Sequence, residues 1–196
     1  MPGQSRLINA YLLFDYANSQ DPNREEIAAV KMPKEVVYGH RMTHTLLKFE
    51  PNASEALLLA ARCQHIRRWE IPRESYPMDR VGYLRWREDL KKFHAKTAGE
   101  ILEKVGYESE LIDRVAFLLQ KKLLKKDPET QILEDVICLV FLEYYLDAFI
   151  AEHDDEKLKT ILAKTWGKMS ERGHKAAQQI SYSQHAQTLL NSALEL

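Results

Sequence analysis

The segment from Gln131 to Ile150, QILEDVICLVFLEYYLDAFI, is apolar around almost the whole circumference of a helix. Asp127-Pro128-Glu129 precedes it and is a strong helix start, because aspartate caps helices and proline is tolerated in the first turn. A helix that is apolar on every side must be covered by other elements. This segment is therefore expected at the centre of the fold.

The rest of the chain also predicts helices, and the expected fold is all-α. The sequence has only 7 Gly and 7 Pro, and no run of β-branched residues alternates with polar ones. Helices are expected at 7–18, at 34–49, from about 54 through 65, at 80–104, from 109 to the lysine cluster at 121–126, over the apolar segment, from 156 and from about 183. With 196 residues, the chain is expected to form one compact helical domain over 1–196.

Composition excludes some functions and locations. Lys and Arg number 28 against 29 Asp and Glu, so no overall charge attracts nucleic acid or an anionic membrane. Cys63 and Cys138 lie in apolar helical patterns without CxxC spacing, which indicates free, buried thiols in a reducing cytoplasm. No apolar run approaches the ~18 residues of a membrane span, and no signal peptide is expected.

Three titratable residues, His65, His94 and Asp135, occupy positions where helical spacing predicts a hydrophobic residue. All three are expected to point inward. A buried carboxylate needs a donor, a cation or a metal, so we predict a shared catalytic pocket of these three residues. The alternative is that each histidine is a satisfied core residue and that Asp135 pairs with an arginine.

The stretch from Gln64 to Arg87, QHIRRWEIPRESYPMDRVGYLRWR, has neither a helical nor an alternating period. Residues 62–92 carry nine basic and five acidic side chains, and arginine binds phosphate or carboxylate at two points. We predict a rim that binds a small anionic or phosphorylated ligand through Arg68, Trp69, Arg80, Tyr83, Arg85 and Trp86. The alternative is a loop held by Arg–carboxylate pairs, with its tryptophans in the core.

The segments ALLLAARCQH, HAKTAGEILEKVGYESELIDRV and DPETQILEDVICLVFLE resemble, in their order, the HD-domain metal-dependent phosphohydrolases, whose fold is an all-α bundle. The resemblance implies an HD-like core over about 33–150, followed by C-terminal helices at 154–195. It also implies a divalent metal of unknown identity, held by His65, His94 and Asp135. Tyr38 and Ile66 stand where that superfamily has a histidine and an aspartate, so we assign Tyr38 to substrate contact and Glu70 as a stand-in ligand.

A second resemblance covers nearly the whole chain. PKEVVYGHRM, AARCQHIRRWEIPRESYPMDRVGYLRWR, FHAKTAGEIL and KMSERGH resemble the family described as domain of unknown function 4202. This resemblance names a family and implies no reaction.

The expected function is hydrolysis of a small phosphorylated or nucleotide-like metabolite, with His65 or a metal orienting a water. The alternative is a non-catalytic sensor of a small anionic ligand, which accounts for the residues at positions 38 and 66 more simply. A third hypothesis is a helical adaptor whose pocket is only structural. No nucleic-acid or membrane partner is expected, and the oligomeric state is left open. His174 and the lysines at 121–126 receive no function.

Overall fold

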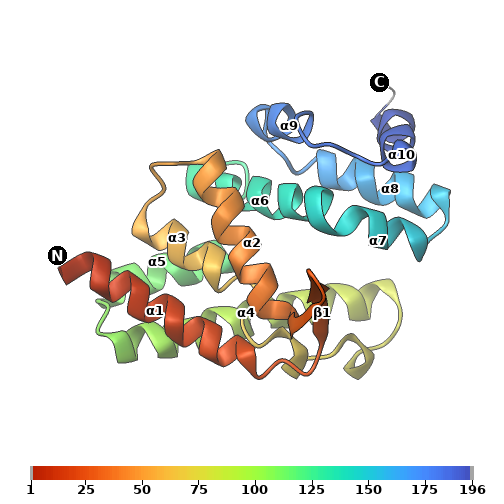
Figure 1. Cartoon of the computed structure of the whole chain (residues 1–196). Coiled ribbons are helices and arrows are strands. Elements are labelled where there is room, and N and C mark those ends of the chain that lie inside the picture. Colours follow the sequence, from red (N-terminus) through yellow and green to blue (C-terminus); the bar gives the residue numbers. More distant parts are fainter. Residues whose placement is uncertain (1, 195–196) are drawn as a thin grey trace. The chain divides into compact units, whose positions relative to one another are not determined.

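The computed structural model describes residues 2–194, with side chains from residue 5 onward. Helices dominate it, which confirms the all-α fold class (Figure 1). The chain forms two compact units, residues 1–123 and 124–196, and each is described by itself. The predicted single domain, with its HD-like core, remains a prediction.

The N-terminal unit begins with three helices that pack on one another, α1 (Pro2–Ser19), α2 (Lys34–Phe49) and α3 (Glu55–Arg62). Ser54 caps α3, because its Oγ accepts a hydrogen bond from the backbone N–H of Leu57 at 3.2 Å. Helix α3 ends at Arg62, so the prediction that it continues through His65 was wrong.

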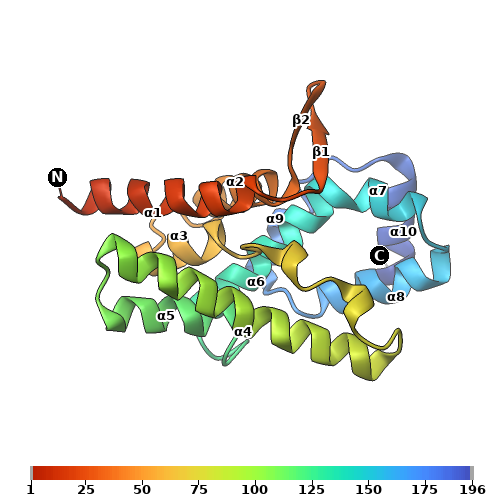
Figure 2. The same ribbon diagram turned by 90° about the horizontal axis from the view of Figure 1, so that it is seen from below.

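The long helix α4 (Arg80–Val105) and the shorter α5 (Ser109–Leu119) complete this unit and lie side by side (Figure 2). Gly106 ends α4 with a φ of 88°, the left-handed conformation that glycine adopts most readily. Helix α5 starts at Ser109, as predicted, and Glu108 precedes it at the capping position without a capping side-chain hydrogen bond.

A small β-hairpin between α1 and α2 was not predicted. Its strands, β1 (Arg24–Ile27) and β2 (Val30–Pro33), are antiparallel and pair Ile27 with Val30 (Figure 2). The two connecting residues, Ala28 and Ala29, have φ values of 48° and 67°. Two-residue hairpin turns of this kind usually carry Asn-Gly or Asp-Gly, so two alanines gave no signal.

The C-terminal unit contains the apolar segment and the last helices. The apolar segment forms α6 (Pro128–Val140), a π-helical turn (Phe141–Tyr145) and α7 (Leu146–Ala151), capped by Asp127 as predicted. Helices α8 (Asp155–Trp166), α9 (Glu171–Ala177) and α10 (Gln184–Leu194) follow. Cys63, in the N-terminal unit, and Cys138 are both buried, as predicted.

Candidate functional site

The chain segment that follows α3 forms part of the candidate site in the N-terminal unit. After α3 the chain turns, Arg67 adopts a positive φ of 50°, and a 3-10 turn (Arg68–Glu70) follows. This path brings His65 against α2, where its ring stacks on that of Tyr38 with the centroids 4.0 Å apart. An inward position was predicted for His65, and its side chain is 25 % exposed, so it points only partly into the interior. The stacking places Tyr38, a predicted substrate contact, beside a predicted catalytic residue.

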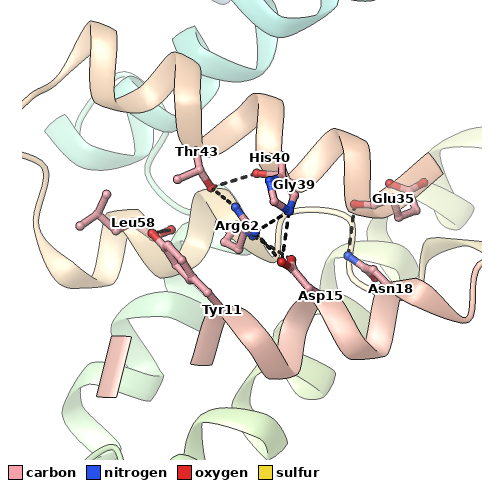
Figure 3. Close-up of polar contacts among 9 residues, drawn as sticks. All are labelled: Tyr11, Asp15, Asn18, Glu35, Gly39, His40, Thr43, Leu58 and Arg62. Atoms are coloured by element: carbon pink, nitrogen blue, oxygen red, sulfur yellow. Dashed lines mark hydrogen bonds and ion pairs between the residues drawn. The ribbon is translucent and has the colours of Figure 1, made fainter. Parts of the chain in front are cut away.

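Glu35 is the carboxylate nearest to His65 among the described contacts, and it was missed in the sequence. Its Oε2 lies 3.4 Å from Nδ1 of His65, and the residue is buried. Glu35 is the second residue of α2, and its backbone N–H donates to Oδ2 of Asp21. Its carbonyl accepts from the side-chain amide of Asn18 (Figure 3). Acidic residues are common at helix starts, which hid its inward position. Its three-residue spacing from buried Tyr38 was the signal available.

Burial sets the protonation of this pair. Burial raises the pKa of Glu35 to about 7, although the positive charges of Arg68 and Lys34 oppose the rise. Burial also lowers the pKa of His65 well below its usual range, and the charges of Arg68, Lys121 and other nearby cations lower it further. At neutral pH the His65 ring is therefore uncharged, and Glu35 exchanges a proton readily. We call Glu35 and His65 the acid–base pair.

His94 lies on α4 beside this pair, 6.0 Å from His65 between ring centroids. Its Nδ1 is 2.8 Å from the carbonyl oxygen of Ile66, so Nδ1 carries the proton and donates it. Burial lowers the pKa of His94 to about 3, which keeps the ring neutral. The Nε2 atom is then an acceptor, and it is buried without a hydrogen-bond partner within the described part of the chain.

Arg68 extends from the 3-10 turn over the ring of Trp86, with Cζ 4.9 Å from the ring centroid. Trp86 is fixed by a 2.8 Å hydrogen bond from its Nε1 to the carbonyl of Ile71. The Arg68 side chain makes no hydrogen bond or ion pair with any residue between 2 and 194. Its charge nevertheless acts on both Glu35 and His65, so the guanidinium lies near the acid–base pair.

Two further residues of α4 complete this surface. Arg87 donates to the hydroxyl of Tyr83 at 3.1 Å, and the Tyr83 ring lies 5.9 Å from that of Trp86. Burial lowers the pKa of Arg68, and the positive charge of Arg87 lowers it further. The two cations are therefore close. We call Arg68, Tyr83, Trp86 and Arg87 the arginine–aromatic cluster.

The other residues of this stretch that were predicted to contact a ligand or a metal lie outside the arginine–aromatic cluster. Trp69 is half-buried, while Arg80 and Arg85 are exposed, and their predicted role remains a prediction. Glu70, the predicted stand-in metal ligand, is bound by Arg67 at 2.6 Å. The Arg–carboxylate pairing that we considered as the alternative thus holds for this pair and not for Arg68.

Asp135 is satisfied within the C-terminal unit. Its Oδ1 accepts from the backbone N–H of Ser170 at 2.7 Å and from Gln131 at 3.1 Å, and its Oδ2 accepts from the Ser170 hydroxyl. Ser170 in turn caps α9 by accepting from the N–H of Gly173. These donors satisfy the hydrogen-bonding requirement of the buried carboxylate. The predicted pocket shared with His65 and His94 remains a prediction.

A second polar cluster in the N-terminal unit was also missed in the sequence (Figure 3). Buried Arg62 donates from Nε and Nη2 to the two carboxylate oxygens of Asp15, and its Nη2 lies 2.7 Å from Nε2 of His40. Thr43 and the ring of Tyr11 complete its surroundings. All three guanidinium nitrogens have partners, so this cluster joins α1, α2 and α3 rather than offering a free binding group.

Two features are absent from residues 2–194, a metal-binding cluster and a membrane-spanning helix. Across residues 2–194, no group of three or more His, Cys, Asp or Glu side chains is arranged to hold a metal ion. The predicted divalent metal remains a prediction. In the same range, no helix has both the length and the apolar character of a membrane span.

Comparison with known proteins gives one match. No curated protein and no solved structure matches the chain. A family model matches residues 9–190, which includes α2, α3, α4 and the α6–α9 segment. The chain therefore belongs to the family described as Domain of unknown function (DUF4202).

Proposed function

We propose that the N-terminal unit binds the phosphate of a small phosphorylated or nucleotide-like metabolite and hydrolyses it. The observation that carries this proposal is that the side-chain donors of half-buried Arg68 have no partner among the described residues. Arginines that are half-buried normally use their donors on carboxylates or carbonyls, because unused donors cost free energy. Arg68 uses none of its side-chain donors within the described residues. A planar guanidinium with free donors matches two phosphate oxygens.

The neighbours of Arg68 strengthen this anion site. Trp86 holds the guanidinium in place by covering one of its faces. Arg87 adds a second positive charge, and Tyr83 presents an exposed ring on which a base or sugar can pack. These groups suit a ligand with a phosphate at one end and a flat or apolar part at the other.

The acid–base pair supplies the chemistry of hydrolysis. In the proposed step, a water oxygen bonds to phosphorus, the ester P–O bond breaks, and the water proton passes to the Glu35 carboxylate. The leaving oxygen then takes up the proton that Glu35 accepted, which restores the carboxylate. A base with a pKa of about 7 is well matched to neutral pH, where it is often ionised and still holds a proton firmly. His65, neutral beside it, orients the carboxyl and relays the proton.

The residues present do not fit the metal site that the HD order implies. Ile66 is fully buried and apolar where that order has an aspartate, and Tyr38 is stacked flat on His65 where it has a histidine. We therefore route no step through a metal.

The same two residues favour a second candidate function, a sensor that binds the anion without turnover. The Tyr38 ring covers one face of His65, which restricts how a substrate can approach that imidazole. A sensor would keep the arginine–aromatic cluster and use the acid–base pair only to report ligand or pH.

Calorimetric titration with inorganic phosphate and adenosine 5′-monophosphate tests the site. We expect Arg68→Met to weaken binding about tenfold or more, because a charged hydrogen-bonded contact is lost. Arg67→Met is the matched control, since Arg67 is adjacent, exposed and already paired with Glu70. Equal affinities in the parent and Arg68→Met contradict the anion site.

A phosphatase screen then separates the two functions. Turnover by the parent that is lost in Glu35→Gln supports the hydrolase. Binding without turnover by any substrate supports the sensor, and turnover that Glu35→Gln retains contradicts the role of the acid–base pair.

A further inference from the structure

His94 carries a feature that the proposed chemistry does not use. Its Nδ1 is committed to the Ile66 carbonyl, and its Nε2 is a buried acceptor without a partner in the described residues. We infer that the phosphorylated ligand also carries a hydroxyl or amino group, and that this group donates a hydrogen bond to Nε2 of His94. This inference rests on the proposed function and makes His94 a specificity-determining residue.

A purely structural role explains His94 poorly. The residue is 4 % exposed, and a buried acceptor without a partner costs about 1–3 kcal/mol. The bond from Nδ1 to Ile66 accounts for only one of the two ring nitrogens. A buried histidine with one nitrogen fixed and the other vacant is oriented for a group that arrives from outside the chain.

The position of Nε2 agrees with the proposed ligand site. The His94 ring lies 6.0 Å from His65, a member of the acid–base pair, and the charge of Arg68 acts on it. Because Nε2 is covered, a ligand reaches it only after a neighbouring side chain moves. The half-buried rings of Phe93, at 5.9 Å, and His65 are the neighbours that can do so.

The protonation of His94 determines which group it accepts. A neutral ring with a lone pair on Nε2 binds a donor and repels a carbonyl or a second phosphate oxygen. The ligand class is therefore a phosphate ester with a hydroxyl or amino group, and a plain alkyl phosphate lacks the contact.

Two pairs of probes test this selectivity by calorimetric titration of the whole chain. Glycerol 3-phosphate is compared with propyl phosphate, and 2-aminoethyl phosphate with ethyl phosphate. The parent should prefer the donor-bearing member of at least one pair by about tenfold. In His94→Asn the amide can still donate to Ile66 but lacks an atom at the Nε2 position, so this preference should disappear while inorganic phosphate binds as before.

The controls separate this inference from the proposed function. His44→Asn, an exposed substitution on α2, should keep the preference of the parent. Equal binding of both members of both pairs by the parent, or a preference that His94→Asn retains, overturns the inference and leaves the anion site standing. A parent that binds no phosphate contradicts the proposed function itself, and the inference falls with it.

Discussion

Replacing Glu35 with glutamine should change how stability depends on pH. In the folded chain the pKa of Glu35 rises from 4.5 to about 7, so the folded state binds this proton more tightly than the unfolded state. The contribution of Glu35 to stability is then full below pH 4.5 and is lost as the pH rises through 7. The rise corresponds to about 3 kcal/mol, most of which is lost between pH 5 and pH 8. Glutamine does not titrate and lacks this loss.

Urea unfolding at pH 5 and pH 8 measures the effect. Trp69 and Trp86 lie in the N-terminal unit and Trp166 in the C-terminal unit, so a Trp166→Phe background makes the fluorescence report the N-terminal unit alone. We expect Glu35→Gln to gain about 2 to 3 kcal/mol relative to its parent between pH 5 and pH 8. The comparison at each pH cancels the titration of groups common to both proteins.

Parallel stability curves for the parent and Glu35→Gln between pH 5 and pH 8 would refute the reasoning. Such curves would mean that Glu35 ionises in the folded chain as it does in water. The cations that face it, Arg68 and Lys34, would then outweigh burial. His65 stays neutral over this range because its pKa is lowered, so its titration does not imitate the effect.

Three further outcomes are expected. Arg62→Met leaves the half-buried Asp15 carboxylate with only the exposed His40 beside it, and should cost more in urea unfolding than the upper limit of about 1 kcal/mol for a surface pair. Gly173→Ala places a Cβ 2.7 Å from Oδ1 of Asp135 and should lower the Tm of the C-terminal unit by several degrees, and an unchanged Tm contradicts this packing. The predicted divalent metal is checked by elemental analysis of protein purified without chelator: near-stoichiometric metal that is lost in His65→Ala supports it, and a metal-free parent contradicts it.

Periodicity and capping chemistry made most helices predictable. The bounds of α2 were predicted to the residue, because Pro33 and the apolar spacing after it mark the start without ambiguity. The end of α3 was not, since His65 continues the stripe of Leu58 and Ala61 past Arg62, where the helix stops. The reason is tertiary: Arg62 is bound by Asp15 from α1, a contact between residues 47 positions apart. Local sequence carries no record of such a contact.

The candidate site was predictable in part, for the same reason. His94 and Arg68 could be chosen because one is polar on an apolar stripe and the other lies in an unusual Arg-rich segment. Glu35 was missed, because a glutamate in the first turn of a helix is ordinary and its three-residue spacing from Tyr38 is a weak signal. Only the turn after α3, which returns His65 to α2, gives that glutamate its neighbour.

The two departures from the HD order have different consequences in the folded chain. Tyr38 is buried and its ring is stacked on that of His65, so Tyr38→His would alter this stacking. Ile66 is fully buried, and its carbonyl accepts the hydrogen bond that orients His94. Ile66→Asp would bury a carboxylate with no donor prepared for it, at a cost of several kcal/mol, whereas Ile66→Val should cost about 1 kcal/mol. A stable Ile66→Asp variant in urea unfolding would mean that the position can still hold an aspartate. Marked destabilisation would mean that the core around Ile66 has been built for an apolar residue, and that the His94 orientation depends on that packing.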